Sequence, residues 1–467
     1  MHIDDTIAAI STPAGHGGIG IVRLSGRDSV KIADRIFRSP KKKKVKETPS
    51  QRILYGHIVN PSTGEIIDEA LISVMKAPNT YTKEDIVEIN CHGGAISLRR
   101  ILELVLSKGA RPARPGEFTQ RAFLNGRIDL AQAEAVLDVV NSLTVQSQKT
   151  AVQQLRGRLS GKIEAIRDEI MELAAFIEAY IDFQEEDIES LALGDMKKRA
   201  LNIKKSLEKL IESSRYGLIL REGLRTAIIG RPNVGKSSLL NALLENDRAI
   251  VTEIPGTTRD VIEDYLNIQG LPIKIMDTAG IRDVEDIAEK EGVKRSLESM
   301  EDADMVLLIL DGSEVLHETD RELIKKSACQ NTILVINKSD LPQKIKFAVT
   351  DLPPPPVNGK KEDFHIVKIS AKKETGLDKL KNKIAETAAG SRTAHGTDTV
   401  TNIRHVHALE KTLVSINSFI SEVTNNTPPE FLSVELREAL DATGEILGLT
   451  SPDDILNKIF SNFCIGK

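Results

Sequence analysis

A glycine-rich segment near the middle of the chain has residue types and spacing suited to holding phosphates. Residues 230–238 read Gly-Arg-Pro-Asn-Val-Gly-Lys-Ser-Ser, which satisfies the pattern G-x-x-x-x-G-K-[S/T]. The glycines let backbone N–H groups wrap the phosphates, Lys236 can reach the β- and γ-phosphates, and the Ser237 hydroxyl can bind Mg²⁺. The pattern has this meaning between a strand and a helix, and the apolar run at 226–229 and the helical stretch at 237–244 provide that context.

Further polar segments that follow in order indicate which base the nucleotide carries. Asp277-Thr-Ala-Gly280, Asn337-Lys-Ser-Asp340 and Ser370-Ala-Lys372 each come after a strand-like run. The Asp340 carboxylate can accept two hydrogen bonds from the N1–H and 2-amino group of guanine, a pair that adenine does not offer. The order therefore predicts GTP over ATP, with Ser237 and Thr258 as Mg²⁺ ligands. The expected GTP contacts are Asn233, Val234, Gly235, Lys236, Ser237, Ser238, Thr252, Glu253, Ile254, Pro255, Gly256, Thr257, Thr258, Asp277, Thr278, Ala279, Gly280, Asn337, Lys338, Asp340, Ser370, Ala371 and Lys372.

The residue after Gly280 raises the question of how such a nucleotide would be hydrolysed. GTPases of the Ras type place a water-orienting Gln there, whereas this chain has Ile281, which can neither position water nor stabilise charge. Exposed Arg231 or Arg282 could donate positive charge. The amide oxygen of Asn233 could instead bind a monovalent cation, which would supply charge at the same place.

Other motifs carry less information. Gly15, Gly17 and Gly20 match G-x-G-x-x-G but lead into a strand-like run rather than a helix, so we interpret them as a connection between strands. The Lys41–Lys44 run favours a solvated loop.

Between residues 99 and 127 seven basic residues accompany two acidic ones, which suits either an anionic partner or ion pairs within the fold. The basic residues are Arg99, Arg100, Lys108, Arg111, Arg114, Arg121 and Arg127, and the acidic ones are Glu103 and Glu117.

The apolar patterning indicates the elements that must position these residues. Residues 1–120 alternate strand-like runs with two helical stretches, which predicts an α+β domain. Apolar residues from Val145 to Ile181 recur at steps of three, four and seven, which predicts one helix of about 37 residues. From residue 223, strand-like runs alternate with helices, which predicts a mainly parallel sheet. We expect an α/β and α multidomain protein with an N-terminal domain at 1–120, a helical domain at 121–222 and 391–467, and a GTPase domain inserted at 223–390.

Composition narrows the class of protein. Among 467 residues, 63 Lys and Arg and 68 Asp and Glu give a net charge of −5, so RNA binding would require a local basic patch. Three widely spaced cysteines argue against a disulfide framework or a zinc site. The N-terminus lacks the pattern of a signal peptide and no apolar stretch reaches about 18 residues, so we expect a cytoplasmic location and no membrane contact.

Two segments, together with the central block, point to a family. Residues 115–134 begin Pro-Gly-Glu-Phe, and residues 463–467 read Phe-Cys-Ile-Gly-Lys. The chain resembles the MnmE (TrmE) family of tRNA modification GTPases from end to end. The resemblance implies a homodimer and a heterotetramer with the flavoprotein MnmG. The resemblance further implies that the heterotetramer acts on tRNA and adds a carboxymethylaminomethyl or aminomethyl group at carbon 5 of the wobble uridine. The N-terminal domain would bind a folate and form the dimer.

The resemblance also implies site residues. Arg23, Glu88, Arg127 and Lys467 would contact 5-formyltetrahydrofolate or a related tetrahydrofolate, and Cys464 would have a chemical role. Asn233, Thr252, Ile254 and Thr257 would bind K⁺, and Glu289 would orient the attacking water. The alternative is a regulatory nucleotide switch such as a ribosome-assembly GTPase. Such proteins often carry a C-terminal G-x-x-G loop, and no glycines after residue 390 form one, which favours the enzyme.

Overall fold

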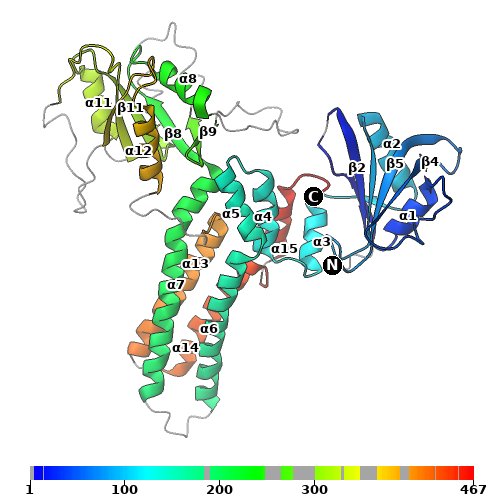
Figure 1. Cartoon of the computed structure of the whole chain (residues 1–467). Helices are drawn as coiled ribbons and strands as arrows, with labels where there is room; N and C mark the ends of the chain where they lie inside the picture. Colours follow the sequence, from blue (N-terminus) through cyan, green and yellow to red (C-terminus); the bar gives the residue numbers. More distant parts are fainter. Residues whose placement is uncertain are drawn as a thin grey trace. The chain divides into compact units, whose positions relative to one another are not determined.

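A computed structural model describes most of the chain. The described residues are 5–13, 15–182, 190–247, 265–276, 300–327, 331–347, 365–389, 399–425, 427–450 and 452–467. They form two compact units (Figure 1). One contains the described residues up to Leu137 and those from Gly444 to Lys467, and the other contains the described residues from Asp138 to Thr443.

A seven-stranded sheet, ordered β3-β4-β5-β6-β2-β1-β7, organises the first unit. Its neighbouring strands are antiparallel except for the parallel pair β1 and β7. Inward-facing side chains alternate along β2, where Val22 and Leu24 are fully buried, as expected for a sheet with one covered face. The strands are β1 (Ile7–Ile10), β2 (Gly17–Ser25), β3 (Phe37–Arg38), β4 (Arg52–Val59), β5 (Ile66–Met75), β6 (Ile86–Gly93) and β7 (Arg111–Pro112).

Two helices complete the core of this sheet. Helices α1 (Ser29–Ile36) and α2 (Ala95–Ser107) bury Ile36 and Ile101 against it. Gly15 lies between β1 and β2, and Gly17 and Gly20 lie in β2, so these glycines lead into a strand and not directly into a helix, as expected from the sequence. The glycine spacing therefore has no dinucleotide-binding context.

A smaller apolar cluster within the first unit joins residues 122–137 to the last helix of the chain. Helices α3 (Glu117–Leu124) and α4 (Leu130–Val140) pack with α15 (Asp453–Ser461). Gly116 has φ +65°, and a Cβ there would lie 2.6 Å from the carbonyl oxygen of Phe460. Glycine is therefore required for α15 to approach α3 this closely.

The second unit includes helices that bury apolar side chains along their length, such as Ile163, Ile170 and Ile203. These helices are α5 (Val145–Leu155), α6 (Arg158–Asp182), α7 (Ser190–Glu222), α13 (Ile403–Thr424) and α14 (Pro429–Leu447). The expectation of one helix from 145 to 181 is wrong. Helix α5 ends at Leu155 and α6 begins at Arg158, because Gly157 between them has the left-handed φ of +82°. The chain changes direction at that glycine, so α5 and α6 can each bury their own apolar side chains.

The second sheet has the mainly parallel arrangement predicted from the sequence. Its order is β13-β12-β11-β8-β10-β9, and only the pair β9 and β10 is antiparallel. Nearly every residue of β11 and β12 is buried, as in sheets covered on both faces. The strands are β8 (Leu224–Ile229), β9 (Tyr265–Ile268), β10 (Leu271–Met276), β11 (Met305–Asp311), β12 (Asn331–Asn337) and β13 (His365–Lys368).

Helices α8 (Lys236–Asp247), α11 (Glu318–Lys326) and α12 (Leu377–Ala389) accompany this sheet. Helix α7 leads into β8 through Gly223 alone, and Ile219 and Leu220 at its end belong to the core of the sheet. The glycine has φ +84°, which allows the turn to follow the helix directly. In the part of the chain that the structure describes, no helix combines the length and apolarity needed to cross a membrane.

Candidate functional site

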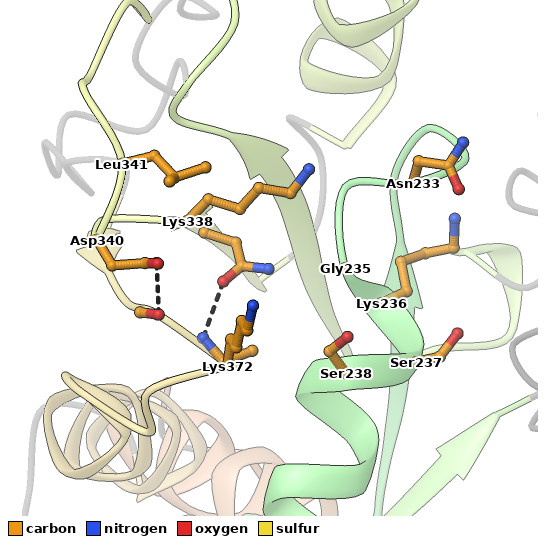
Figure 2. Close-up of a pocket in the computed structure, with 12 residues that line it drawn as sticks. Asn233, Gly235, Lys236, Ser237, Ser238, Lys338, Asp340, Leu341 and Lys372 are labelled. Carbon is orange, nitrogen blue, oxygen red and sulfur yellow. Dashed lines mark hydrogen bonds between the residues drawn. The ribbon is translucent and has the colours of Figure 1, made fainter.

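A cavity of about 400 Å³ lies at the carboxyl ends of β8 and β12 (Figure 2). The loop that leads from β8 into α8 contributes one side, and the segments after β12 and β13 contribute the other. Every lining residue except Leu341 was expected from the sequence. The lining residues are Asn233, Gly235, Lys236, Ser237, Ser238, Asn337, Lys338, Asp340, Leu341, Ser370, Ala371 and Lys372.

The two glycines of the loop are required by close contacts. Gly230 has φ +148°, and a Cβ there would lie 2.4 Å from the carbonyl oxygen of Ile309. Gly235 has φ +98°, and a Cβ there would lie 2.2 Å from Nδ2 of Asn337. Asn233, at φ +63°, also adopts the left-handed conformation. Only residues without a Cβ fit at Gly230 and Gly235, so these two glycines permit the conformation of the loop.

Lys236 is held at the centre of this loop. Its ammonium group donates to the carbonyl oxygens of Gly230 and Arg231, at 2.8 Å each. Burial lowers the pKa of this amine to about 8. A cation that loses its water shell in this way is well placed to be neutralised by phosphate oxygens.

The other side of the cavity presents a carboxylate and a rigid amide. Ser370 is fully buried, and its hydroxyl donates to Oδ1 of Asp340 at 2.6 Å, which lowers the pKa of Asp340 (Figure 2). Asn337 is buried and bridges the two sides, because its Nδ2 donates to Val234 O at 2.9 Å and its Oδ1 accepts from Ala371 N at 3.0 Å. Hydrogen bonds through Asn337 thus connect the segment that orients the carboxylate to the phosphate loop.

Sequence patterns did not reveal all of these contacts. The hydroxyl of Ser370 orients Asp340, a contact that the Ser370-Ala-Lys372 motif did not indicate. Lys338 forms an ion pair with Asp311 at the end of β11, with Nζ and Oδ2 separated by 2.5 Å. Burial would raise the pKa of Asp311, but Lys338 and Ser313 hold it below its ordinary value. A carboxylate directly after a buried strand was the available signal for this residue.

Arg231 is engaged within the fold. Its Nε donates to both carboxylate oxygens of Asp320 at 2.9 and 3.0 Å, and its Nη2 donates to Glu314 at 3.1 Å. Asp320 is itself buried at the start of α11. Arg231 therefore ties the phosphate loop to α11 instead of presenting an unpaired charge to a nucleotide.

Several predicted site residues lie outside the described residues, so the structure places only part of the expected site. They are Thr252, Glu253, Ile254, Pro255, Gly256, Thr257, Thr258, Asp277, Thr278, Ala279, Gly280, Ile281, Arg282 and Glu289.

A second group of predicted residues meets in the first unit. Arg23 and Glu88 are direct partners in the pairing of β2 with β6, and their side chains form an ion pair at 2.8 Å. The guanidinium groups of Arg23 and Arg127 lie 6.0 and 4.4 Å from the ring centre of Tyr81, a residue that no motif indicated. Cations arranged around one aromatic ring are stabilised by its π-face.

The segment at 463–467 is attached to the same group. Arg23 Nη1 and Ser11 Oγ both donate to the carbonyl oxygen of Gly466, at 3.2 and 3.1 Å. The N–H groups of Gly116 and Phe118 donate to the carbonyl oxygens of Cys464 and Lys467. These N–H groups begin α3 and have no partner inside the helix, so the tail supplies the missing acceptors.

The cations near this tail differ in pairing, and the thiols of the first unit differ in exposure. Burial lowers the pKa of the Lys467 ammonium. Cys464 is exposed, whereas Cys91 is buried in the sheet core and burial raises the pKa of its thiol to about 11. Among the described residues, neither Arg127 nor Lys467 has an ion-pair partner. Two unpaired cations and an accessible thiol therefore lie around Tyr81 and the tail.

Much of the basic segment 99–127 serves the fold. Arg121 is fully buried and pairs with Asp5, Glu84 and Glu117. Arg111 binds Glu117 through two hydrogen bonds of 3.0 and 2.6 Å. Burial would raise the pKa of Glu117, but Arg111 and Arg114 hold it below its ordinary value. Of the two interpretations, ion pairs within the fold account for these arginines.

Comparison with known proteins covers the full chain. Residues 6–127 match the family model "GTP-binding protein TrmE N-terminus" and residues 130–464 match "MnmE helical domain". The tRNA modification GTPase MnmE of Alkaliphilus oremlandii is 47% identical over 468 residues, 100% of both chains. That of Geobacillus thermodenitrificans is 48% identical over 466 residues, 99% of both chains. A crystal structure of Aquifex aeolicus Era with GDP and AlF4⁻ is 31% identical, covers 41% of this chain and 66% of that chain, and has a TM-score of 0.25.

Proposed function

This chain belongs to the MnmE family of tRNA modification GTPases, and from that membership we propose the reaction that it serves. Together with the flavoprotein MnmG, in a heterotetramer, the protein adds a carboxymethylaminomethyl or aminomethyl group at carbon 5 of the wobble uridine of certain tRNAs. A tetrahydrofolate such as 5-formyltetrahydrofolate supplies one carbon, and GTP hydrolysis accompanies the modification. The observation that carries the proposal is the presence, in one chain, of a guanine-compatible phosphate cavity and a cationic group with an accessible thiol.

The first chemistry is GTP binding in the 400 Å³ cavity. The backbone of residues 233–237 and the Lys236 ammonium hold the phosphates, and Asp340 binds the guanine edge. Ser237 and Thr258 ligate Mg²⁺, which neutralises charge on the phosphates when bound. The crowding at Gly230 and Gly235 supports this assignment, because a Cβ at either position would collide with Ile309 or Asn337 and prevent the loop from adopting this conformation.

Hydrolysis needs a source of positive charge other than arginine. Arg231 is committed to Asp320 and Glu314, and Ile281 has no polar group. We assign a K⁺ site to Asn233, Thr252, Ile254 and Thr257, and assign Glu289 the positioning of water. A bound K⁺ supplies the charge that an arginine finger provides elsewhere, an effect worth roughly 10³ to 10⁵ in rate. Asn233 lines the cavity together with Lys236 and Ser237, which supports the assignment.

The cation assignment predicts a salt-specific rate. GTP hydrolysis should be much faster in KCl than in NaCl at equal ionic strength, and Asn233→Ala should remove the difference. Glu289→Ala should slow hydrolysis while leaving GTP affinity intact. Equal wild-type rates in the two salts would reject the K⁺ site and return attention to Arg282.

The second chemistry is folate binding by the first unit. Residues 1–120 form the folate-binding and dimerisation domain, and Arg23, Glu88, Arg127 and Lys467 contact the folate. Anionic glutamate groups of a folate suit the unpaired charges of Arg127 and Lys467. Cys464 lies in the tail that Arg23 and Ser11 hold in place, so its thiol is available to the same site.

Mass analysis of wobble uridines tests the whole proposal. A strain lacking this protein should accumulate unmodified wobble uridine, and the wild-type gene should restore the modified nucleoside. A regulatory nucleotide switch that acts in ribosome assembly would leave wobble uridines fully modified in the deletion strain, and that result would contradict the proposal.

A further inference from the structure

The lysine run at 41–44 occupies a well-defined loop between β3 and β4. Val45, the one large apolar side chain of this loop, is fully buried in the core of the first sheet. Thr48 is also buried, and its hydroxyl donates to the carbonyl oxygen of Lys44 at 2.9 Å. The loop is therefore fixed from beneath while Lys41, Lys42, Lys43 and Lys44 are all exposed.

Further cations are brought to the same place by hydrogen bonds. Lys46 N–H donates to Oδ1 of Asp34 at 3.4 Å, and the Lys76 ammonium donates to the carbonyl oxygen of Lys46 at 3.4 Å. Arg38 donates to the last carbonyl oxygens of α1, which lead into the loop. We call this surface the basic corner, and it consists of Arg38, Lys41, Lys42, Lys43, Lys46 and Lys76.

The charges of the basic corner are poorly compensated. Lys44 pairs with Glu47 at 3.7 Å, but within the described ranges no ion pair is formed by Lys41, Lys42 or Lys43. The arginines of the segment 99–127 behave differently, because Arg111 and Arg121 are neutralised by buried carboxylates. In a chain of net charge −5, this loop therefore concentrates positive charge that repels itself.

We propose that the basic corner binds the sugar–phosphate backbone of tRNA, an inference that rests on the proposed function. Lysines are compact point charges that suit phosphate contacts rather than bidentate base reading. All six members of the corner are basic, whereas the core of a protein interface is apolar. Binding here is electrostatic, independent of sequence and sensitive to salt, because each lysine releases counterions from the RNA.

The test compares two triple variants of the full chain. Lys41→Gln, Lys42→Gln and Lys43→Gln together should weaken tRNA binding roughly tenfold or more at low salt. The slope of log affinity against log salt concentration should fall by about 2 to 3, or about 1 for each lysine. GTP turnover without tRNA should equal that of the wild type, which verifies that the variant is folded.

Helix α7 offers a matched control. Lys198, Lys205 and Lys209 are exposed on one face of that helix, and their replacement by Gln changes the net charge equally. This control should keep the wild-type affinity and salt slope. Unchanged binding by the 41–43 variant, or an equal loss in the control, would overturn the basic corner alone. A wild-type protein that binds no tRNA would overturn the proposed function as well.

Discussion

Burial and phosphate binding both change the pKa of the Lys236 amine, in opposite directions. Its pKa of about 8 describes the protein before phosphates are bound. Phosphate oxygens favour the charged amine, so the pKa in the GTP complex is higher. Below pH 8 the amine is charged in both states, and above pH 8 binding must take up a proton. GTP affinity should therefore fall about fourfold between pH 7 and pH 8.5.

Calorimetric titration in two buffers of different ionisation enthalpy measures this proton directly. Uptake should be visible at pH 8.5 and nearly absent at pH 7, and Lys236→Met should show none at either pH. An affinity that does not change between these pH values would show that the amine is charged throughout.

Asp340 should determine the choice of base. Ser370 fixes one of its carboxylate oxygens at 2.6 Å, so an amide introduced at this position would keep the same orientation. Asp340→Asn presents a donor to the 2-amino group of guanine, whereas xanthine has an acceptor oxygen there. Competition titrations should show GTP affinity reduced about 100-fold or more and xanthosine triphosphate preferred, since a misplaced polar group is costly. Wild-type affinity for GTP would disprove the assignment.

The residues that line the cavity, apart from Leu341, could be predicted because their types and spacing indicate phosphate and base binding. Leu341 and the hydroxyl of Ser370 could not, since a leucine or serine has no distinctive spacing. The pairing of Arg231 with Asp320 joins positions that are 89 residues apart, so only the folded chain reveals that this arginine is occupied.

At the scale of elements, apolar spacing predicted helices better than it predicted their ends. The stripe from Val145 to Ile181 continues across Gly157, and a period alone cannot tell a continuous helix from two helices that share a seam. The left-handed φ of Gly157 ends the first helix, so the chain forms two helices here. The strands were easier to place, because β11 and β12 are continuous apolar runs bounded by polar residues.

Gly466 should decide whether the tail remains on the first unit. Its φ is +97°, and a Cβ there would lie 2.4 Å from the carbonyl oxygen of Ile10. Gly466→Ala should therefore release the tail and deprotect the Phe118 amide, which donates to Lys467 O. Hydrogen exchange measures this amide.

Gly64→Ala is the matched control, because Gly64 also has a positive φ, +76°, but a Cβ there would meet nothing within 4 Å. It should leave the Phe118 amide protected. If the Phe118 amide lost its protection equally in both variants, backbone strain rather than the close approach of residue 466 to Ile10 would explain the loss.

At the scale of the whole molecule, the two most informative sequence motifs are parts of one contact. Pro-Gly-Glu-Phe at 115–118 and Cys-Ile-Gly-Lys at 464–467 lie far apart in the sequence, and yet Gly116 N–H donates to Cys464 O. The resemblance to a family identified both motifs, but spacing alone could not show that they meet. The described residues that line the cavity all belong to the other unit, so the cavity and the group around Tyr81 have separate residue sets.

This division predicts that the two activities can be separated by one substitution. Cys464→Ser should strongly reduce or abolish wobble uridine modification in cells while basal GTP turnover stays at the wild-type level, because Cys464 lines no part of the GTP cavity. Cys91→Ser is the control, since that thiol is buried with a pKa of about 11 and is unsuited to nucleophilic chemistry. Normal modified uridine in the Cys464 variant would remove its chemical role, whereas collapse of GTP turnover in the isolated protein would mean that the tail also supports the GTPase.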